Sequence, residues 1–386
     1  MNAKSFCAAV LILGPVLAGR AENASVKPAA PVANKEIKAY CLDFNWAATG
    51  RKRKPFAAPG TWAGADPAAH VAWYKAMGAN VIQTFAVSCN GYAWYKNGVV
   101  PEQPGLKHDF LTEVVKLGRK EGMQVFGYFC IASNPKWGKD HPDLSYGTPT
   151  TYHIPYTDEY LAYLSASIKD AVTKTGIDGF MIDWVWMPNR ASTTNKWLAC
   201  EKKLYKQLMG GEFPGEDVLT EKSPKHTEYS RKAIDRCWKT IRKAAKDANP
   251  NCIVWLTSNN TTHPHVVNSD MYKETDWLMN ECGSMKGVDA VKAMVGTHTR
   301  LITCLARWNG QDATEVVPEA LKAGIGLYGF TVPRNGGGLV PLEGILSRPV
   351  SELQGDDRNI AVLARAYHGV SIDAVGQDGK CEEKAK

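Results

Sequence analysis

The 386-residue sequence has no long apolar run after its first 20 residues. A helix that crosses a bilayer needs about 20 consecutive apolar residues, so stable membrane insertion is not expected. A strong charge of one sign is also lacking. The formal net charge is +7, and the basic residues are scattered apart from the cluster at 51–54. Nucleic-acid binders usually gather such residues on one face, so no nucleic-acid partner is expected.

Several motifs with a defined chemistry are missing as well. The chain has no Gly-x-Gly-x-x-Gly or P-loop phosphate cradle, no Gly-x-Ser-x-Gly nucleophile turn and no His-Glu-x-x-His zinc motif. Its ten cysteines include no Cys-x-x-Cys pair. His153, His263 and His265 lie in predicted loops and are interpreted as polar loop residues. The sequence therefore predicts no metal site and no cofactor.

The N-terminal segment has the organisation of a secretory signal peptide. Lys4 precedes an apolar core over residues 6–17, and Gly19-Arg20-Ala21 is a small-x-small cleavage site. We expect residues 1–21 to be removed and the Ala-, Pro- and Lys-rich residues 22–36 to form an exposed linker. The expected location is therefore secreted or periplasmic.

Export permits disulfide bonds, but the positions of the cysteines do not indicate a disulfide framework. Cys7 leaves with the leader, and six of the remaining nine lie in or at the ends of predicted strands. Buried cysteine is commonly a small apolar filler. A bridge between Cys200 and Cys237 is compatible with export, but spacing alone does not pair them.

A strand-like run, a loop and a helix-like run alternate through the chain. Eight runs are β-branched or aromatic and almost continuously apolar, as in strands covered on both faces. They are residues 37–46, 80–88, 124–132, 178–184, 252–258, 276–281, 300–306 and 325–331. This alternation favours a (β/α)8 TIM barrel over an open doubly wound sheet. We expect one catalytic α/β domain over residues 37–370 and a polar tail over 371–386.

Helix start and stop signals lie between these runs. Asp66-Pro67 begins a helix that ends at Gly78, as N-cap, proline and glycine preferences indicate. The other predicted helices cover residues 109–121, 157–175, 226–248, 287–295, 313–323 and 359–368. Long connections over residues 90–107, 133–156 and 188–223 leave the carboxyl ends of strands, where barrels build their active sites.

Two carboxylates end apolar strands. Asp183 follows Gly-Phe-Met-Ile, and Glu281 follows Trp-Leu-Met-Asn. Such a pair suits glycoside hydrolysis, in which one carboxylate attacks the sugar and a second carboxyl protonates the leaving oxygen. We interpret Asp183 as the nucleophile and Glu281, beside Trp and Met, as a general acid. The alternatives are a helix cap or an ion pair with Arg190 for Asp183, and a structural salt bridge for Glu281.

Other polar and aromatic residues follow the strands and are candidate sugar contacts. The sequence contains 12 Trp and 15 Tyr, whose flat amphipathic rings suit sugar faces. The candidates are Asp43, Trp46, Asn90, Tyr92, Tyr128, Trp184, Trp186, Asn259 and Trp308. Asp43 serves equally well as a turn cap, and the two tryptophans after Asp183 serve equally well in packing. Asp178, at the other end of its strand, is interpreted as a turn residue.

These residues lie in segments that resemble a known group. Residues 78–95 (GANVIQTFAVSCNGYAWY) resemble the strand-two segment of α-L-fucosidase-like glycoside hydrolases, and QVFGY at 124–128 and GFMID at 179–183 follow in the same order. That group includes the hypothetical glycosyl hydrolase family 6 domain, the α-fucosidases of family 151 and, more remotely, family 29. The resemblance covers residues 37–190 well and the second half only by topology.

The resemblance implies a retaining mechanism in which the strand-four aspartate, Asp183, is the nucleophile. Glu281 as acid/base rests on its position after strand six. Where the fucosidases place histidines after strand two, this chain has Ser88, Cys89 and Asn90, a departure that leaves the sugar open. An exported hydrolase of an α-linked sugar, of fucose or galactose type, in an oligo- or polysaccharide is the expected function.

Two alternatives to this function stay open. One is a catalytically silent barrel that binds glycans through its aromatic residues. The other is a barrel that acts on a non-sugar substrate through a metal held by Asp43 and Asp183. The sequence leaves the sugar, the linkage and the oligomeric state open.

Overall fold

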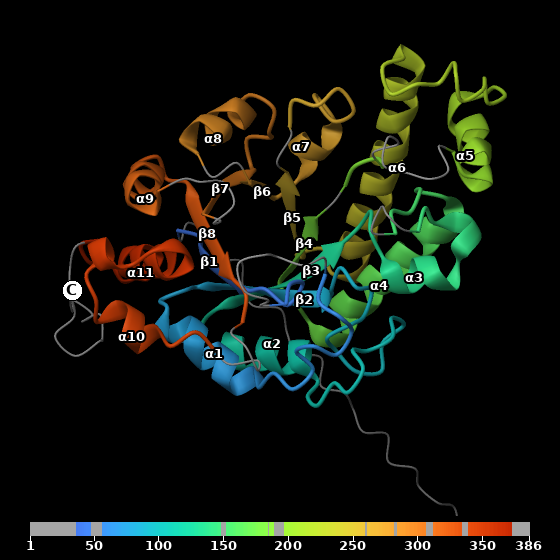
Figure 1. Ribbon diagram of the computed structural model, residues 1–386. Helices are drawn as coiled ribbons and strands as arrows, with labels where there is room; N and C mark the ends of the chain where they lie inside the picture. Colours follow the sequence, from blue (N-terminus) through green and yellow to red (C-terminus); the bar gives the residue numbers. More distant parts are fainter. Residues whose placement is uncertain are drawn as a thin grey trace, which may run out of the picture.

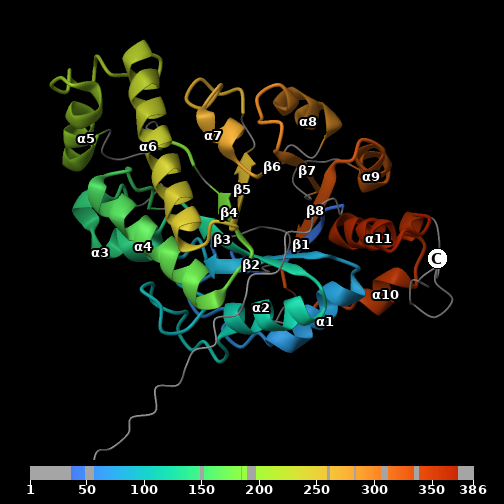
Figure 2. The same cartoon turned by 180° about the vertical axis from the view of Figure 1, so that it is seen from behind.

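A computed structural model describes residues 36–47, 56–147, 152–183, 185–188, 197–258, 261–281, 284–305, 312–333 and 339–372. Within these ranges, eight parallel strands close a barrel in sequence order, with helices around its outside (Figures 1 and 2). The last strand pairs with the first, with Tyr328 opposite Ala39. The predicted (β/α)8 barrel is confirmed.

Each predicted strand is present in a slightly shorter form, because its end residues leave the hydrogen-bonded ladder to enter a connection. Glu281, predicted to be the last residue of its strand, lies just beyond it. The strands are β1 Lys38–Leu42, β2 Val81–Val87, β3 Gln124–Cys130, β4 Gly179–Asp183, β5 Ile253–Ser258, β6 Trp277–Asn280, β7 Arg300–Leu305 and β8 Gly326–Thr331.

The predicted helices are also present, and their ends follow the expected capping chemistry. Asp66 accepts hydrogen bonds from the first free amides of α1, and Gly176 ends α4 with a φ of 69°, a conformation that glycine adopts without strain. These helices are α1 Pro67–Ala76, α2 Phe110–Lys120, α4 Asp158–Thr175, α6 Pro224–Ala248, α8 Met285–Lys292, α9 Ala313–Lys322 and α11 Gly355–His368.

The connections contain further helices that were not predicted. The largest is α5 (Ala199–Met209), which lies beside α6 in the connection that follows β4 (Figures 1 and 2). The others are α3 Pro135–Asp140, α7 Asp270–Glu274, α10 Leu342–Leu346 and the 3-10 helices Pro142–Leu144 and Val350–Glu352. The regions predicted as long loops are therefore partly folded, mainly on the side of β3, β4 and β5.

Aromatic side chains fill the barrel interior below the strand ends. The Phe126 ring lies 4.7 Å from the Trp277 ring and 5.5 Å from the Trp255 ring, and Tyr328 contacts Trp255 at 5.5 Å. A side chain at Gly179 would place its Cβ 2.4 Å from the Ile253 carbonyl oxygen and from the Phe126 ring. Glycine at the start of β4 therefore permits this close packing against β5.

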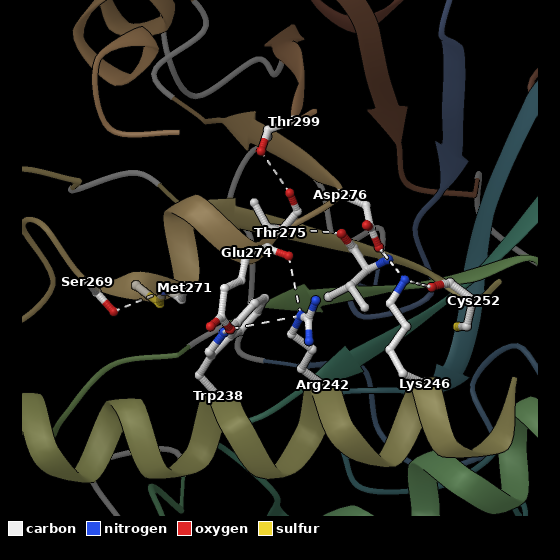
Figure 3. A network of polar contacts seen from close by, with 11 residues as sticks. Trp238, Arg242, Lys246, Cys252, Ser269, Met271, Glu274, Thr275, Asp276 and Thr299 are labelled. Carbon is white, nitrogen blue, oxygen red and sulfur yellow. Dashed lines mark hydrogen bonds and ion pairs between the residues drawn. The ribbon is translucent and has the colours of Figure 1, made fainter. Parts of the chain in front are cut away.

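Polar contacts fix α6 to the segment that leads into β6, as Figure 3 shows. On one face of α6, the Trp238 indole donates to Glu274 Oε2 at 2.8 Å and Arg242 Nε donates to the Glu274 carbonyl oxygen at 3.3 Å. One turn further along, Lys246 Nζ lies 2.9 Å from Asp276 Oδ2. The segment at the start of β6 is therefore held by residues from three successive turns of α6.

Cysteines act as buried filler at the strand positions that the structure describes. Cys41, Cys89, Cys130, Cys252 and Cys304 are buried thiols, while Cys282 lies outside the described residues. Cys200 and Cys237 are both free thiols, so the bridge considered for them is not formed.

The expected leader (residues 1–21) and almost all of the linker and polar tail lie outside the described residues. Among the helices of the described part, none has both the length and the apolar character to cross a membrane.

Candidate active site

A cavity of about 380 Å³ lies at the carboxyl ends of the strands. The residues around it come from the ends of strands spread around the barrel, including β1, β3, β4 and β6. Of the predicted site residues, this cavity brings together Asp43, Trp46, Tyr128, Asp183, Trp186 and Glu281. Two candidate catalytic carboxyls and four candidate sugar contacts therefore share one hollow.

Asp183 is held by a hydrogen bond from the neighbouring strand. It is the last residue of β4, paired in register with Cys130, and its side chain is half-buried. Tyr128 Oη donates to Asp183 Oδ2 at 2.7 Å. Because side chains alternate between the two faces of a strand, the apolar Met181 lies on the same inner face as Asp183. The carboxylate thus ends an apolar strand at the cavity wall.

The donor Tyr128 is buried and has a second polar neighbour. Cys89 Sγ lies 3.1 Å from Tyr128 Oη. Burial, with a smaller contribution from the nearby Asp183, raises the pKa of the Tyr128 phenol well above its ordinary value. Tyr128 therefore stays protonated as a hydrogen-bond donor. It was predicted as a sugar contact, and the structure shows that it donates to Asp183.

Glu281 lies directly after β6, in surroundings that favour its protonated form. Thr257 Oγ1 donates to Glu281 Oε1 at 2.8 Å, and the Glu281 amide donates to the Ser258 carbonyl oxygen at 3.2 Å. Burial raises the pKa of the Glu281 carboxyl, and the hydrogen bond from Thr257 offsets part of this rise. This is the direction that a general acid requires.

Asp43 closes a turn and also lines the cavity. Its Oδ1 accepts from the Asn45 amide at 2.7 Å, which closes the turn after β1. The buried carboxylate nevertheless lines the cavity. Asn45, which was not predicted, lines it as well, and its side-chain oxygen accepts from the Cys89 amide at 2.8 Å. The described residues contain no group of three or more His, Cys, Asp and Glu side chains placed to hold a metal ion.

The cavity floor contains a polar pair that sequence reasoning missed. Tyr328 Oη donates to Gln83 Oε1 at 2.7 Å, and both residues are buried. The only indication in the sequence was a glutamine within the largely apolar run of β2. On the cavity wall, the half-buried Trp46 lies 5.6 Å from the Phe56 ring, so the predicted aromatic contact has a second aromatic beside it.

Two predicted sugar contacts lie away from the cavity. The Asn90 side chain donates to the Ala57 carbonyl oxygen at 3.3 Å and accepts from Gln103 Nε2 at 3.1 Å. Its oxygen also accepts from the Tyr92 amide at 3.2 Å. Neither Asn90 nor Tyr92 lines the cavity. These bonds organise the connection after β2, which is an ordinary use of asparagine in loops.

Several residues named in the predictions lie in parts of the chain that the structure does not describe. Trp184, Asn259 and Trp308, together with Arg190, the ion-pair partner considered for Asp183, lie outside the described residues. Asp178 lies at the opposite end of β4, where its carboxylate accepts from Arg119 at 2.8 Å and from the Val125 amide at 2.9 Å. The predicted turn residue is therefore also an ion-pair partner at the bottom of the barrel.

Residues 66–184 match the family model described as hypothetical glycosyl hydrolase 6. This segment runs from the start of α1 through β4 and contains both Tyr128 and Asp183. The barrel is similar to that of α-L-fucosidase isoenzyme 2 from Paenibacillus thiaminolyticus, with a TM-score of 0.60, 14% identity, and coverage of 87% of this chain and 49% of that chain. The chain forms a (β/α)8 barrel whose fold is similar to that of this fucosidase.

A second solved structure is similar to this barrel. The β-galactosidase from the psychrophilic Marinomonas ef1 has a TM-score of 0.54 and 10% identity, and the match covers 87% of this chain and 61% of that chain. The chain spans about half the length of the fucosidase and about three fifths of the galactosidase. At these identities the two structures establish the fold. No curated protein matches the sequence. The family match relates residues 66–184 to glycosyl hydrolases.

Proposed function

We propose that this protein is an exported, retaining glycoside hydrolase that removes an α-linked sugar, of fucose or galactose type, from a glycan. The observation that carries the proposal is the placement of Asp183 and Glu281 on one cavity, each with a hydroxyl donor of its own. The type of sugar rests on the α-L-fucosidase-like segments, and export rests on the features of residues 1–21.

The surroundings of the two carboxyls favour different roles. Asp183 accepts a hydrogen bond from a tyrosine that stays protonated, which suits a carboxylate. The raised pKa of Glu281 suits a carboxylic acid that gives up a proton. Pairs of carboxyls whose environments differ in this way commonly divide the acid and nucleophile roles. We therefore assign the nucleophile to Asp183 and the acid/base to Glu281.

The proposed reaction has two steps. In the first, an Asp183 oxygen forms a bond to the anomeric carbon while the bond to the leaving oxygen breaks, and that oxygen takes the Glu281 proton. In the second, water attacks the anomeric carbon, gives its proton to Glu281 and releases the Asp183 carboxylate. Two displacements at one carbon retain the configuration of the sugar.

The first experiment is hydrolysis of a panel of aryl α- and β-glycosides by residues 22–386, beside D183A and E281Q. We expect D183A to lose turnover and azide to restore it with a glycosyl azide of inverted configuration. E281Q should be slowed by about 100- to 10,000-fold. That loss should shrink for a dinitrophenyl leaving group, which departs without a proton. D247A, a substitution of an exposed carboxylate on α6, is the matched control.

The panel also separates the alternatives. If the wild-type protein hydrolyses none of the glycosides, and if wild-type and D183A proteins bind glycans equally well, the protein is a silent binding barrel. Activity that disappears on chelation and returns with a divalent metal would contradict the two-carboxylate mechanism.

A further inference from the structure

A second, larger cavity of about 620 Å³ lies beside the first, over the carboxyl ends of β4 and β5. It is enclosed by residues 185–188, the end of β5, the segment 263–266 and the first turns of α6 and α7. Neither of the predicted catalytic carboxyls, Asp183 and Glu281, lines it. Its size lies within the range of small-molecule sites, roughly 300–1,000 Å³.

Two residues connect this second cavity to the first. Trp186 lines both cavities, and its carbonyl oxygen accepts from the buried Tyr156 hydroxyl at 3.1 Å, which fixes the backbone at the boundary. Thr257 lines the second cavity and donates to Glu281, which lines the first, at 2.8 Å. The Glu281 carboxyl therefore stands at the boundary between the two cavities.

The lining has the mixed character that sugar rings require. Apolar side chains, among them Met187 and Val266, form one part of it. The polar part includes Ser258, Thr227 and His265. A pyranose presents both C–H faces and hydroxyl edges, so apolar walls combined with a few hydroxyl and imidazole groups match its surface.

His265 is held in place before a ligand arrives. Its ring lies 5.2 Å from the buried His226 ring and 4.4 Å from the exposed His263 ring. A side chain packed between two rings loses little freedom on binding, which reduces the entropic cost of a hydrogen bond to a sugar hydroxyl.

We propose that the second cavity binds the leaving-group sugar, so that the natural substrate is a glycan of at least two rings. A general acid protonates the oxygen that joins the two sugars, so the leaving sugar must lie across that acid from the sugar that is removed. The first cavity, around Asp183, takes the removed sugar, and the second cavity takes its neighbour. The inference rests on the proposed function.

The test compares two substrates with the same removed sugar. One is the aryl glycoside found in the panel, whose leaving group is a single small ring without sugar hydroxyls. The other is the matching di- or trisaccharide. The variants are H265A, which removes a polar group, and T227F, which fills the cavity from α6. The controls are H298A, an exposed histidine away from both cavities, and T240F, a threonine of α6 that does not line the cavity.

We expect H265A to lower kcat/KM for the oligosaccharide about 10-fold, the value of one hydrogen bond. T227F should lower it further. Both variants should change the aryl glycoside by less than about twofold, and both controls should leave the two substrates unaffected. Equal losses on both substrates, or no loss on the oligosaccharide, would overturn the proposal.

Failure of the proposed function has a different signature. A wild-type protein that hydrolyses neither substrate would contradict that function. In that event, titration calorimetry of the oligosaccharides against wild-type and T227F protein decides the role of the second cavity by itself. Weaker binding to T227F than to T240F supports a glycan site, and equal binding overturns it.

Discussion

Tyr128 and Thr257 each donate a hydrogen bond to a carboxyl group in the same cavity, but the two carboxyls have different surroundings. Glu281 is held by its own strand end and by β5, where burial outweighs the single hydroxyl donor. Asp183 lies beside Tyr128 of β3, whose hydroxyl also contacts Cys89 in the connection after β2. One cavity at the barrel mouth is therefore lined by two carboxyl groups in different surroundings.

The pKa of Glu281 gives a testable pH dependence. A general acid is active while protonated, so activity falls as the pH rises through its pKa. The Thr257 hydrogen bond lowers that pKa. Replacing Thr257 by valine should therefore raise the pKa further and move the alkaline limb of kcat/KM to higher pH, by about one to two units, since a hydrogen bond to a charged group contributes about 1.5–3 kcal/mol.

The measurement uses an aryl glycoside whose leaving group requires the proton. Because this substrate has no second sugar, sugar binding in the second cavity does not affect the pH profile. T303V is the matched control. Thr303 is buried on β7 opposite Asn280, and its hydroxyl has no hydrogen-bond partner among the described residues. An alkaline limb that moves equally in both variants, or that stays fixed in T257V, would contradict the assignment of Glu281.

The site residues that could be predicted from the sequence are those whose strand position alone determines their direction. Asp183 and Glu281 each follow an apolar run, and the carboxyl ends of parallel barrel strands face one mouth. Asn45 and Gln83 were missed because their roles depend on partners far along the chain, Cys89 after β2 and Tyr328 on β8. Asn90 follows the end of a strand, as a site residue should. Its side chain, however, forms hydrogen bonds with Gln103 of its own connection and with Ala57, and it does not line the cavity.

At the scale of elements, α6 does more than cover β4 and β5. Lys246 Nζ contacts both Asp276 Oδ2, at 2.9 Å, and the Cys252 carbonyl oxygen, at 2.7 Å. Asp276 Oδ2 also accepts from the Val254 amide at 2.8 Å. One carboxylate therefore joins α6, β5 and the start of β6, whose other end leads to Glu281.

Replacing Asp276 by alanine should lower the free energy of unfolding by about 1–3 kcal/mol, because it leaves the Val254 amide and the Lys246 ammonium without this acceptor. Urea denaturation measures the loss. D289A breaks an exposed ion pair with Lys292 on α8 and should cost less than about 0.5 kcal/mol. Similar losses in the two variants would show that the Asp276 contacts contribute no more than a surface ion pair.

The length and the capping residues of a helix decided whether it could be predicted from the sequence. The helices that were predicted are long, and several have a side-chain cap such as Asp66 or Thr157. The helix α5 begins after Leu198 without a side-chain cap, and α10 begins after Pro341 in the same way. The helices α3 and α7 have six and five residues, too few for a periodic apolar stripe to be recognised.

At the scale of the whole molecule, the closed barrel explains why residues far apart in sequence form one site. Pairing of β8 with β1 brings Tyr328 against Gln83, and parallel strands place every carboxyl end at one mouth. The position of the second cavity depends on connections that vary independently of the barrel, such as the segment 185–188. The barrel could be predicted from strand periodicity, whereas the two-cavity arrangement could not.

The proposal of export makes a separate prediction about the whole chain. The apolar core at residues 6–17 is shorter than the about 20 residues that span a bilayer, and it stands between Lys4 and the small-x-small site that ends at Ala21. In a Gram-negative host, the full chain with a C-terminal tag should accumulate in the periplasm. Mass spectrometry should find an N-terminus at Glu22.

A charge placed in the apolar core should block this export because it breaks the segment that the secretion machinery recognises. L13R should leave an uncleaved cytoplasmic protein, whereas V26R, in the linker, should be processed as the wild-type chain is. A periplasmic protein that begins at Gly19 would still support a cleaved signal peptide, with cleavage at the bond after Ala18. An intact N-terminal region on the wild-type chain, with equal distribution of the two variants, would contradict export. The glycan substrate would then have to be met inside the cell.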